Sequence, residues 1–236
     1  MDKFIASCVF TRTYPELSER IQQYIRERWQ MSVMRCCVIN YKVRSFEEEI
    51  ARESWSALPH FLPFEKGDRM IYLCHNCSAI FMEQQPDIPI ISLWELILQD
   101  EAFPYPDHSG MEAGIQDCWR SKENAEEQAA VRQLLGKMNI KAVELAEHHA
   151  ETDFCGFSLY QPAPPRNLKL APKRFIENAE GKFEAHTQEE KEKLMRAYVS
   201  RQRTKTIVGY CHYCVDGLRL GGAEAFHIAE LLFPEK

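Results

Sequence analysis

The feature that most constrains this chain of 236 residues is the placement of its nine cysteines, which form two copies of one pattern. Each copy has an isolated cysteine, then a middle cysteine, then a C-x-x-C. The first copy consists of Cys8, Cys36, Cys37, Cys74 and Cys77, and the second consists of Cys118, Cys155, Cys211 and Cys214. Scattered buried thiols would not sort into two such sets. The sequence therefore predicts two metal or cluster sites, one in each half.

The odd number of cysteines and the two C-x-x-C elements favour metal or redox chemistry over a disulfide framework. The N-terminus lacks the basic and apolar regions of a signal peptide, and the longest apolar stretch is too short for a transmembrane segment. We therefore expect a soluble, cytoplasmic protein. The net charge is −6 and no stripe of Lys or Arg is present, which argues against a nucleic-acid partner.

The duplication extends beyond the cysteines. Each half begins with a short apolar strand that ends at a cysteine, continues into an amphipathic helix, and later has a strand that runs into the C-x-x-C. Each half closes with a similar amphipathic segment, in which Glu95 aligns with Glu230. The predicted strands are residues 4–8, 70–73, 113–118 and 206–209, and the predicted helices begin at Pro15 and cover 125–138. This alternation predicts an α/β fold of two pseudo-repeated lobes, each a small, largely parallel sheet flanked by helices.

We place the first lobe at residues 1–100 and the second at 101–236, with a linker rich in turn-forming residues at 99–112. The second lobe is longer because 55 residues separate Cys155 from Cys211, whereas 36 separate Cys37 from Cys74. The surplus is assigned to the Pro-rich stretch at about 161–187. This stretch is predicted to be a surface loop, either a plain insertion or a contact for a partner or substrate.

Four of the cysteines are predicted to lie where a strand gives way to a helix. In parallel α/β folds, ligands gather at this edge of the sheet. The amides at a helix N-terminus also favour the thiolate, which is the form that binds metal. Both the predicted position and the expected thiolate form therefore favour metal binding by Cys8, Cys74, Cys118 and Cys211.

The order of these motifs, C-xn-C-C-G-xn-C-x-x-C present twice, resembles the cysteine-rich CCG domain. That domain occurs in the B subunit of heterodisulfide reductase and in related subunits of lactate-utilisation, glycerol-3-phosphate dehydrogenase and fumarate/succinate reductase complexes. The resemblance covers essentially the whole chain. It includes the lead-in Asp117-Cys118 and the ending His-Ile-Ala-Glu-Leu-Leu at 227–232.

The resemblance implies a non-cubane [4Fe–4S] cluster in the first lobe, which is the site of disulfide reduction in the reductases. Its ligands would be Cys8, Cys36, Cys37, Cys74 and Cys77, with the vicinal pair Cys36 and Cys37 as catalytic residues. The second lobe keeps four thiolates, which suffice for a second [4Fe–4S] cluster or for a structural zinc ion. These metal ligands are Cys118, Cys155, Cys211 and Cys214.

The sequence departs from the family pattern in both lobes. Val38 stands where the motif has glycine, and a β-branched side chain does not fit a backbone with positive φ or a close approach to a cluster. Phe154 replaces the first cysteine of the second pair. His75 and His212 stand inside the C-x-x-C elements, where the family more often has proline. Each could bind the metal directly, donate a proton, or hydrogen-bond to a sulfur or the backbone.

Three further histidines of the second lobe are candidates, and two of them lie near the predicted second site. His148 and His149 precede Phe154 and are expected to be a polar pair in a loop, with metal binding as the alternative. His227 lies in the closing segment, where a capping or core role is expected.

Three functions remain open. The first is an iron–sulfur redox subunit that passes electrons to a disulfide or another small acceptor, and it is the one that the resemblance favours. The second is a zinc-stabilised binding or assembly module without redox activity. The third, a metal-free dithiol at Cys36 and Cys37, is disfavoured because a disulfide between adjacent residues is strained. A redox subunit without a flavin or nicotinamide motif implies a ferredoxin-like or flavoprotein partner, expected to dock near the Pro-rich stretch; the substrate and the oligomeric state stay open.

Overall fold

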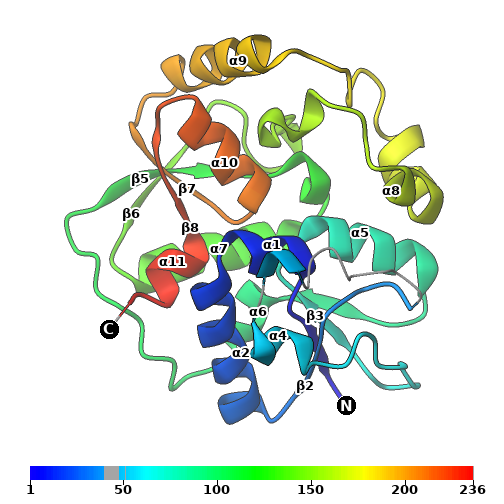
Figure 1. Cartoon of the computed structure of the whole chain (residues 1–236). Helices are drawn as coiled ribbons and strands as arrows, with labels where there is room; N and C mark the ends of the chain where they lie inside the picture. The colour runs from blue at the N-terminus through cyan, green and yellow to red at the C-terminus, as the bar shows by residue number, and fades with distance from the viewer. Residues whose placement is uncertain (40–47, 51, 236) are drawn as a thin grey trace. The chain divides into compact units, whose positions relative to one another are not determined.

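The structure, a computed structural model, describes residues 1–39, 48–50 and 52–235. Its contacts divide the chain within helix α6 into unit 1, Met1–Leu96, and unit 2, Ile97–Lys236. The elements of unit 1 are β1 Lys3–Ile5, α1 Cys8–Thr13, α2 Pro15–Trp29, β2 Ser32–Met34, α4 Glu53–Ser56, β3 Met70–Tyr72, α5 His75–Gln84, β4 Ile90–Ser92 and α6 Leu93–Leu98, as labelled in Figure 1.

Unit 1 is built on a four-stranded parallel sheet in the order β2-β1-β3-β4. Each crossover between parallel strands contains helix, as this connection requires. The three residues of β3 are all buried, which is typical of a parallel strand with both faces covered.

Unit 2 repeats this plan in the order β6-β5-β7-β8, again with every pair parallel. Its strands and α-helices are β5 Glu112–Gln116, α7 Ala125–Lys137, β6 Lys141–Glu144, α8 Pro165–Leu170, α9 Gln188–Ser200, β7 Thr206–Gly209, α10 His212–Leu220, β8 Glu224–His227 and α11 Ile228–Leu232. It also has 3-10 helices at Trp119–Ser121, His149–Glu151 and Gly156–Leu159, and a π-helix at Lys173–Glu177.

The predicted fold class, α/β with two parallel sheets flanked by helices, is confirmed. In each unit the chain moves from the first strand to one side of the sheet and then crosses to the other side. This places a topological switch point between β1 and β3 in unit 1 and between β5 and β7 in unit 2. Ligands of open α/β sheets bind outside the carboxyl ends of strands at such points.

The two longest helices predicted from periodicity form as expected. In α2, Pro15 occupies the first turn, where a missing N–H costs nothing, and Leu17, Ile21 and Ile25 are buried along one face. Helix α7 begins after Asn124, whose side chain accepts a hydrogen bond from the amide of Glu127 at 3.1 Å.

The aligned glutamates of the closing segments have the same structural role. The carboxylate of Glu95 accepts hydrogen bonds from the amide and hydroxyl of Ser92, at 2.8 and 2.7 Å, and Ser92 Oγ accepts from the amide of Glu95. Glu230 accepts from the amide of His227 at 2.6 Å, while His227 Nδ1 accepts from Ala229 at 3.2 Å. Both are capping boxes that turn the last strand into a helix. His227 therefore has the expected capping role.

The prediction of a loop at 161–187 was wrong in part, because this stretch contains α8 and the π-helix. Its prolines start helix instead of preventing it: Pro165 is the first residue of α8, where its fixed φ is favourable. Ala171 and Phe175 are buried and anchor the stretch to the core of unit 2. We call residues 161–187 the cap.

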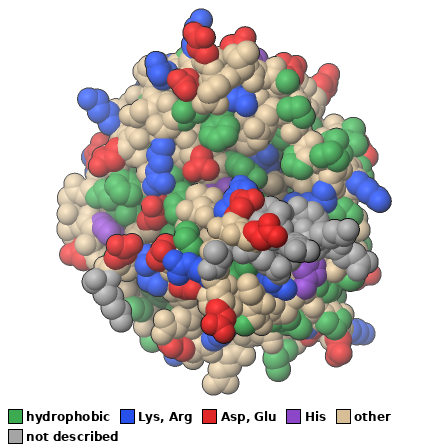
Figure 2. Space-filling model, in the orientation of Figure 1, with side chains coloured by type: hydrophobic (Ala, Val, Ile, Leu, Met, Phe, Trp, Pro, Cys, Tyr) green, Lys and Arg blue, Asp and Glu red, His purple; other side chains and the backbone are tan. Residues whose placement is uncertain are grey.

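None of the described helices has both the length and the apolar character needed to cross a membrane. Figure 2 shows basic and acidic side chains interleaved on one face of the molecule.

Candidate metal centre

Two thiols of unit 2 lie at the carboxyl ends of the strands that flank its switch point. Cys118 follows β5 and is the N-cap of the 3-10 helix Trp119–Ser121. Cys211 follows β7 and is the N-cap of α10, whose first turn carries Cys214. The sheet thus brings together residues that are almost one hundred positions apart in the sequence.

The fourth thiol, Cys155, reaches the same place through an unusually close backbone contact. Gly156 has a φ of +61°, and a Cβ there would overlap the carbonyl oxygen of Tyr213. A Cβ on Gly217 of α10 would in turn overlap Gly156. Two glycines are therefore required for the segment that carries Cys155 to pack onto the helix that carries Cys214.

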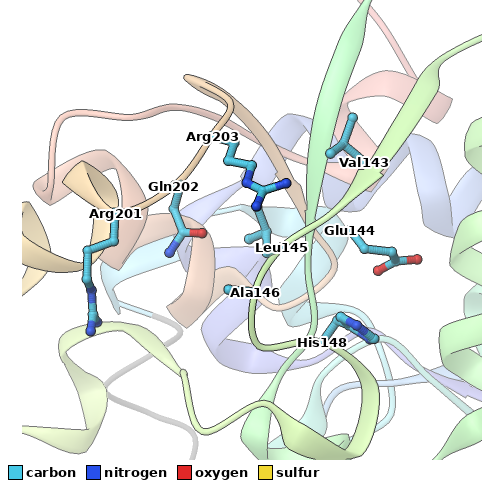
Figure 3. A pocket seen from close by; sticks show the side chains of 8 residues that line it. All are labelled: Val143, Glu144, Leu145, Ala146, His148, Arg201, Gln202 and Arg203. Carbon is cyan, nitrogen blue, oxygen red and sulfur yellow. The ribbon is translucent and has the colours of Figure 1, made fainter.

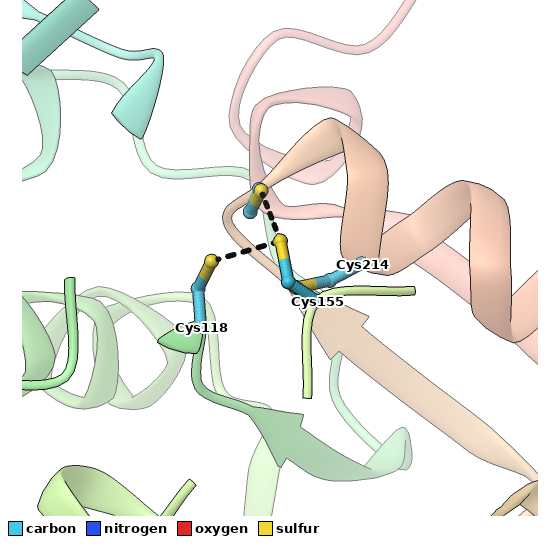
Figure 4. A group of neighbouring side chains, drawn as sticks. Cys118, Cys155 and Cys214 are labelled. Atoms are coloured by element: carbon cyan, nitrogen blue, oxygen red, sulfur yellow. Dashed lines mark hydrogen bonds between the residues drawn. The ribbon is translucent and has the colours of Figure 1, made fainter. Parts of the chain in front are cut away.

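The four sulfur atoms of unit 2 lie within 4.8 Å of one another, and all four residues are buried. Cys155 Sγ lies 3.4 Å from Cys118 Sγ and 3.8 Å from Cys211 Sγ, as the dashed lines in Figure 4 mark. All four are free thiols. We call this set the four-thiol site.

These separations fit a single tetrahedral ion. A Zn–S bond of about 2.3 Å places two tetrahedral thiolates about 3.8 Å apart. In a cubane [4Fe–4S] cluster each thiolate binds a different iron atom, so the four sulfur ligands must stand farther apart. The donor set suits either centre, but the observed spacing matches one ion and would have to expand around a cluster.

Without a metal, ionisation of Cys118 and of Cys214 is unfavourable. Burial raises the pKa of Cys118 well above its usual range, and the neighbouring Cys155 and Cys211 raise it further. The pKa of Cys214 is raised for the same reasons. A cation among the sulfur atoms would reverse this effect, because it binds the thiolate form.

One cation is already present beside the sulfur atoms. Arg120 is 5% exposed, and its Nη1 donates hydrogen bonds to Cys155 Sγ and, at 3.1 Å, to Ser158 Oγ. Its backbone amide donates to Cys118 Sγ at 3.4 Å. Burial lowers the pKa of Arg120, but charge on Cys155, Cys118 and Cys211 outweighs this and raises it above its ordinary value.

The cap closes over the segments that carry Cys118 and Cys155. Phe183 packs edge-on against Trp119, with ring centroids 5.7 Å apart. Arg174 forms an ion pair with Glu123 at 2.7 Å, and Lys182 forms one with Asp153 at 3.2 Å. The additional residues of the second half thus help to exclude water from its thiols.

In unit 1 the structure brings four of the five predicted ligands together. Cys77 hydrogen-bonds to both Cys37 and Cys74 and lies near Cys8; the bond to Cys37 and burial raise its pKa well above the usual range. The bond to Cys77 and burial likewise raise the pKa of Cys74, while a hydrogen bond from Ser7 lowers it. The thiol of Cys36 is buried and makes no hydrogen bond to a described residue.

The thiols of unit 1 are nonetheless less tightly grouped. Within the described part of the chain, no three of them lie mutually within 4.8 Å. Val38 stands at the position of Gly156, and Ile80 stands at that of Gly217. Both have a β-branched side chain, so the close backbone contact of unit 2 cannot be repeated here. By the same alignment, Cys36 corresponds to Phe154, which stacks on Tyr198 with ring centroids 4.0 Å apart.

The histidines are not part of the four-thiol site. His75 and His212 are buried inside their C-x-x-C elements, and among the described residues neither belongs to a group of potential metal ligands. His148 and His149 form a different group with Glu144. Their Nδ1 atoms are 2.8 Å apart, which is a hydrogen bond between the rings.

The Glu144–His148–His149 group could ligate a metal, but its carboxylate is already engaged. Arg132 donates to both oxygens of Glu144 at 2.7 Å and lies 3.4 Å from His149 Nδ1. The same guanidinium pairs with buried Asp117 at 2.7 Å. A divalent ion would have to displace this guanidinium. The group is better described as an ion-pair network that fixes the side chain of Asp117, the residue that precedes Cys118.

A pocket of about 270 Å3 opens beside this network at the carboxyl end of β6. Figure 3 shows Gln202 and Arg203 on one side of it and His148 on another. No cysteine lines it, so it is separate from the four-thiol site.

Sequence reasoning missed Arg120 and Asp117 as parts of this centre. The signal for Arg120 was a basic residue two positions after a predicted ligand, where a turn would carry it back over the sulfur. In the sequence, Asp117 is visible only as part of the lead-in motif Asp117-Cys118. Its partners, Arg132 and Tyr210, come from distant segments, and no local pattern indicates them.

The sequence matches none of the models of known protein families that were compared with it. A search of curated proteins likewise finds no match.

Proposed function

We propose that the chain is a metal–thiolate protein of the iron–sulfur type, acting as a redox subunit. The observation that carries this proposal is that buried thiols from matching sequence positions gather at the switch point of both sheets, tightly in unit 2 and more loosely in unit 1. The corresponding residues are Cys8, Cys37, Cys74 and Cys77 in unit 1 and Cys118, Cys155, Cys211 and Cys214 in unit 2. Packing alone does not require thiols at four matched positions twice.

An iron–sulfur centre would supply reversible one-electron transfer. The chain's own residues would bind it through thiolates, exclude water from it and balance its charge. The looser set in unit 1 supports assigning the larger centre there, because cluster ligands stand farther apart than the ligands of one ion. Electron transfer to a disulfide or other small acceptor, with a ferredoxin-like or flavoprotein donor, is the role proposed for unit 1.

The sulfur separations in unit 2 favour a second candidate function. Their match to one tetrahedral ion supports a zinc-stabilised module, in which metal binding contributes folding free energy and no electrons are transferred. The two candidates can apply to different units of the same chain.

Metal analysis of protein purified without oxygen tests both candidates. A brown protein with several irons per chain, an absorbance band near 400 nm and a paramagnetic signal on reduction is expected for the redox subunit. A colourless protein with stoichiometric zinc would refute the redox proposal and leave the zinc module. A chain with neither metal would refute both.

A further inference from the structure

Arg120 is an unusual residue to find inside a cluster of thiols. Among the described residues no carboxylate pairs with it, and its Nε is buried without a hydrogen-bond acceptor. Its guanidinium is surrounded by the rings of Trp119, Phe175, Phe183 and Tyr213, with its central carbon 5.0–6.0 Å from their centroids. A charge taken out of water in this way is costly unless an opposite charge lies beside it.

Within the described residues, the groups that can supply the opposite charge are the sulfur atoms that Arg120 faces. Four thiolates carry four negative charges. A divalent ion, or a cluster core of the same charge, leaves a complex with two negative charges in a dry interior. A guanidinium cannot lose its proton in a protein, so it supplies a permanent positive charge at this point. The positive charge of Arg120 and the negative charge of the filled site therefore stabilise each other, and this attraction offsets the cost of removing both from water.

We propose that Arg120 is the built-in counter-cation of the four-thiol site and determines the charge of the metal centre that the site accepts. This inference rests on the proposed metal centre, but it does not depend on whether that centre is one ion or a cluster. It also assigns a role to the cap: Phe175 and Phe183 keep the guanidinium away from water, so that its charge acts on the sulfur atoms at low dielectric.

The test compares Arg120→Met, which removes the charge at similar volume, with Arg120→Lys, which keeps it. Arg174→Met is the matched control, because Arg174 also lies over Trp119, at 5.7 Å, but its ion pair is with Glu123. Each full-length variant is loaded with zinc, and metal loss is followed during titration with a chelator. We expect Arg120→Met to weaken retention by about 10- to 100-fold, as for other groups that contact ligands. Arg120→Lys should recover most of this loss, and Arg174→Met should lie within about threefold of the parent.

A second measurement does not depend on folding efficiency. In iron-loaded protein, losing a nearby positive charge must lower the reduction potential of the unit 2 centre, since the reduced state carries more negative charge. Equal retention and equal potential in the parent and Arg120→Met would overturn the role of Arg120 while leaving the metal centre intact. An equal loss in Arg174→Met would show that cap packing, and not charge, is responsible. A parent chain that binds no metal would refute the metal centre itself.

Discussion

Units 1 and 2 share a strand order, a switch point and a capping box, yet they surround their thiols differently. In unit 2, glycines at 156 and 217 allow the segment that carries Cys155 to lie against α10, and the cap covers the result. In unit 1, Val38 and Ile80 stand at the two glycine positions. Topology therefore decides where the thiols meet, while a few side chains decide how closely they meet.

The residue that precedes the first thiol also differs between the units. Unit 2 has Asp117, buried and bound by Arg132, Tyr210 and the amide of His149. Unit 1 has Ser7, with a φ of 53° and a hydrogen bond to Cys74. Thus a network of charged side chains surrounds the residue before the first thiol of unit 2. In unit 1 the corresponding residue is a single serine with a strained backbone.

The largest expected effect comes from removing one thiol in each unit. Cys155→Ser should empty the four-thiol site and unfold much of unit 2, since structural metal sites contribute about 10 kcal/mol of apparent binding free energy. Cys37→Ser should empty unit 1 alone. Metal content per chain and limited proteolysis of each unit measure the two outcomes.

Cys36→Ser is the control for this pair. Cys36 occupies the position of Phe154, and its thiol makes no hydrogen bond to a described residue, so unit 1 should keep its metal. If Cys36→Ser loses as much metal as Cys37→Ser, all five cysteines are ligands, as the sequence predicted.

The next largest effect concerns Asp117. Asp117→Asn should cost about 3 kcal/mol, because it leaves Arg132 with one carboxylate partner in a partly buried position. Ser7→Ala in unit 1 should cost about 1 kcal/mol, the usual value of a lost helix cap. Urea unfolding of metal-loaded protein, with parent and variant compared at equal metal content, gives both values.

The contribution of Asp117 also has a defined pH dependence. Burial would raise its pKa, but Arg132, the His149 amide and Tyr210 together hold it below the ordinary value of 3.8. The stabilisation is therefore present above that value and is lost as the pH falls through the lowered pKa. The difference in unfolding free energy between the parent and Asp117→Asn should therefore narrow as the pH falls below 3.8. A difference that stays constant would show that the Asp117 carboxylate is not stabilised by these partners.

A smaller effect is expected from the glycines. Gly156→Ala should cost about 2 kcal/mol, because positive φ and a steric overlap coincide there. Gly136→Ala, in an exposed turn of α7 with no atom near the new methyl group, should instead stabilise by about 0.5–1 kcal/mol. Thermal unfolding measures the change in stability of each variant. If Gly156→Ala stabilises the protein as Gly136→Ala does, the close contact at Gly156 is not required.

The smallest effect tests the feature that the units share most closely. Glu95→Gln and Glu230→Gln should each cost about 1 kcal/mol through the capping box. Glu230 also pairs with Arg219 at 2.8 Å, but an exposed pair adds little. Nearly equal shifts in the thermal unfolding of the two variants are therefore expected, and a large difference would show that the closing segments are not equivalent.

The repeated elements could be predicted from sequence because they follow local rules. Periodicity located α2 and α7, and the alignment of Glu95 with Glu230 predicted that the two closing segments are alike, although not that each is a strand that turns into a helix. The contact between Gly156 and Gly217 could not be predicted, because it depends on two segments packing at a distance that only the folded chain defines. The packing of the cap on Trp119 could not be predicted for the same reason, because it also depends on contacts between distant segments. In sequence, the prolines and charges of the cap are like those of a plain loop.

The position of the cap in the chain has a kinetic consequence. It lies between Cys155 and Cys211 in the chain, a few residues after Cys155 and separated from Cys211 by α9 and β7, so both thiols belong to the stretch of chain that contains their cover. The four thiols are buried, and we expect detachment of the cap from Trp119 to give water and competing ligands access to an ion held there. The lifetime of the bound ion is then set by the rate of this local opening as well as by bond strength. Exchange with free metal should accordingly be slow even where the equilibrium affinity is modest.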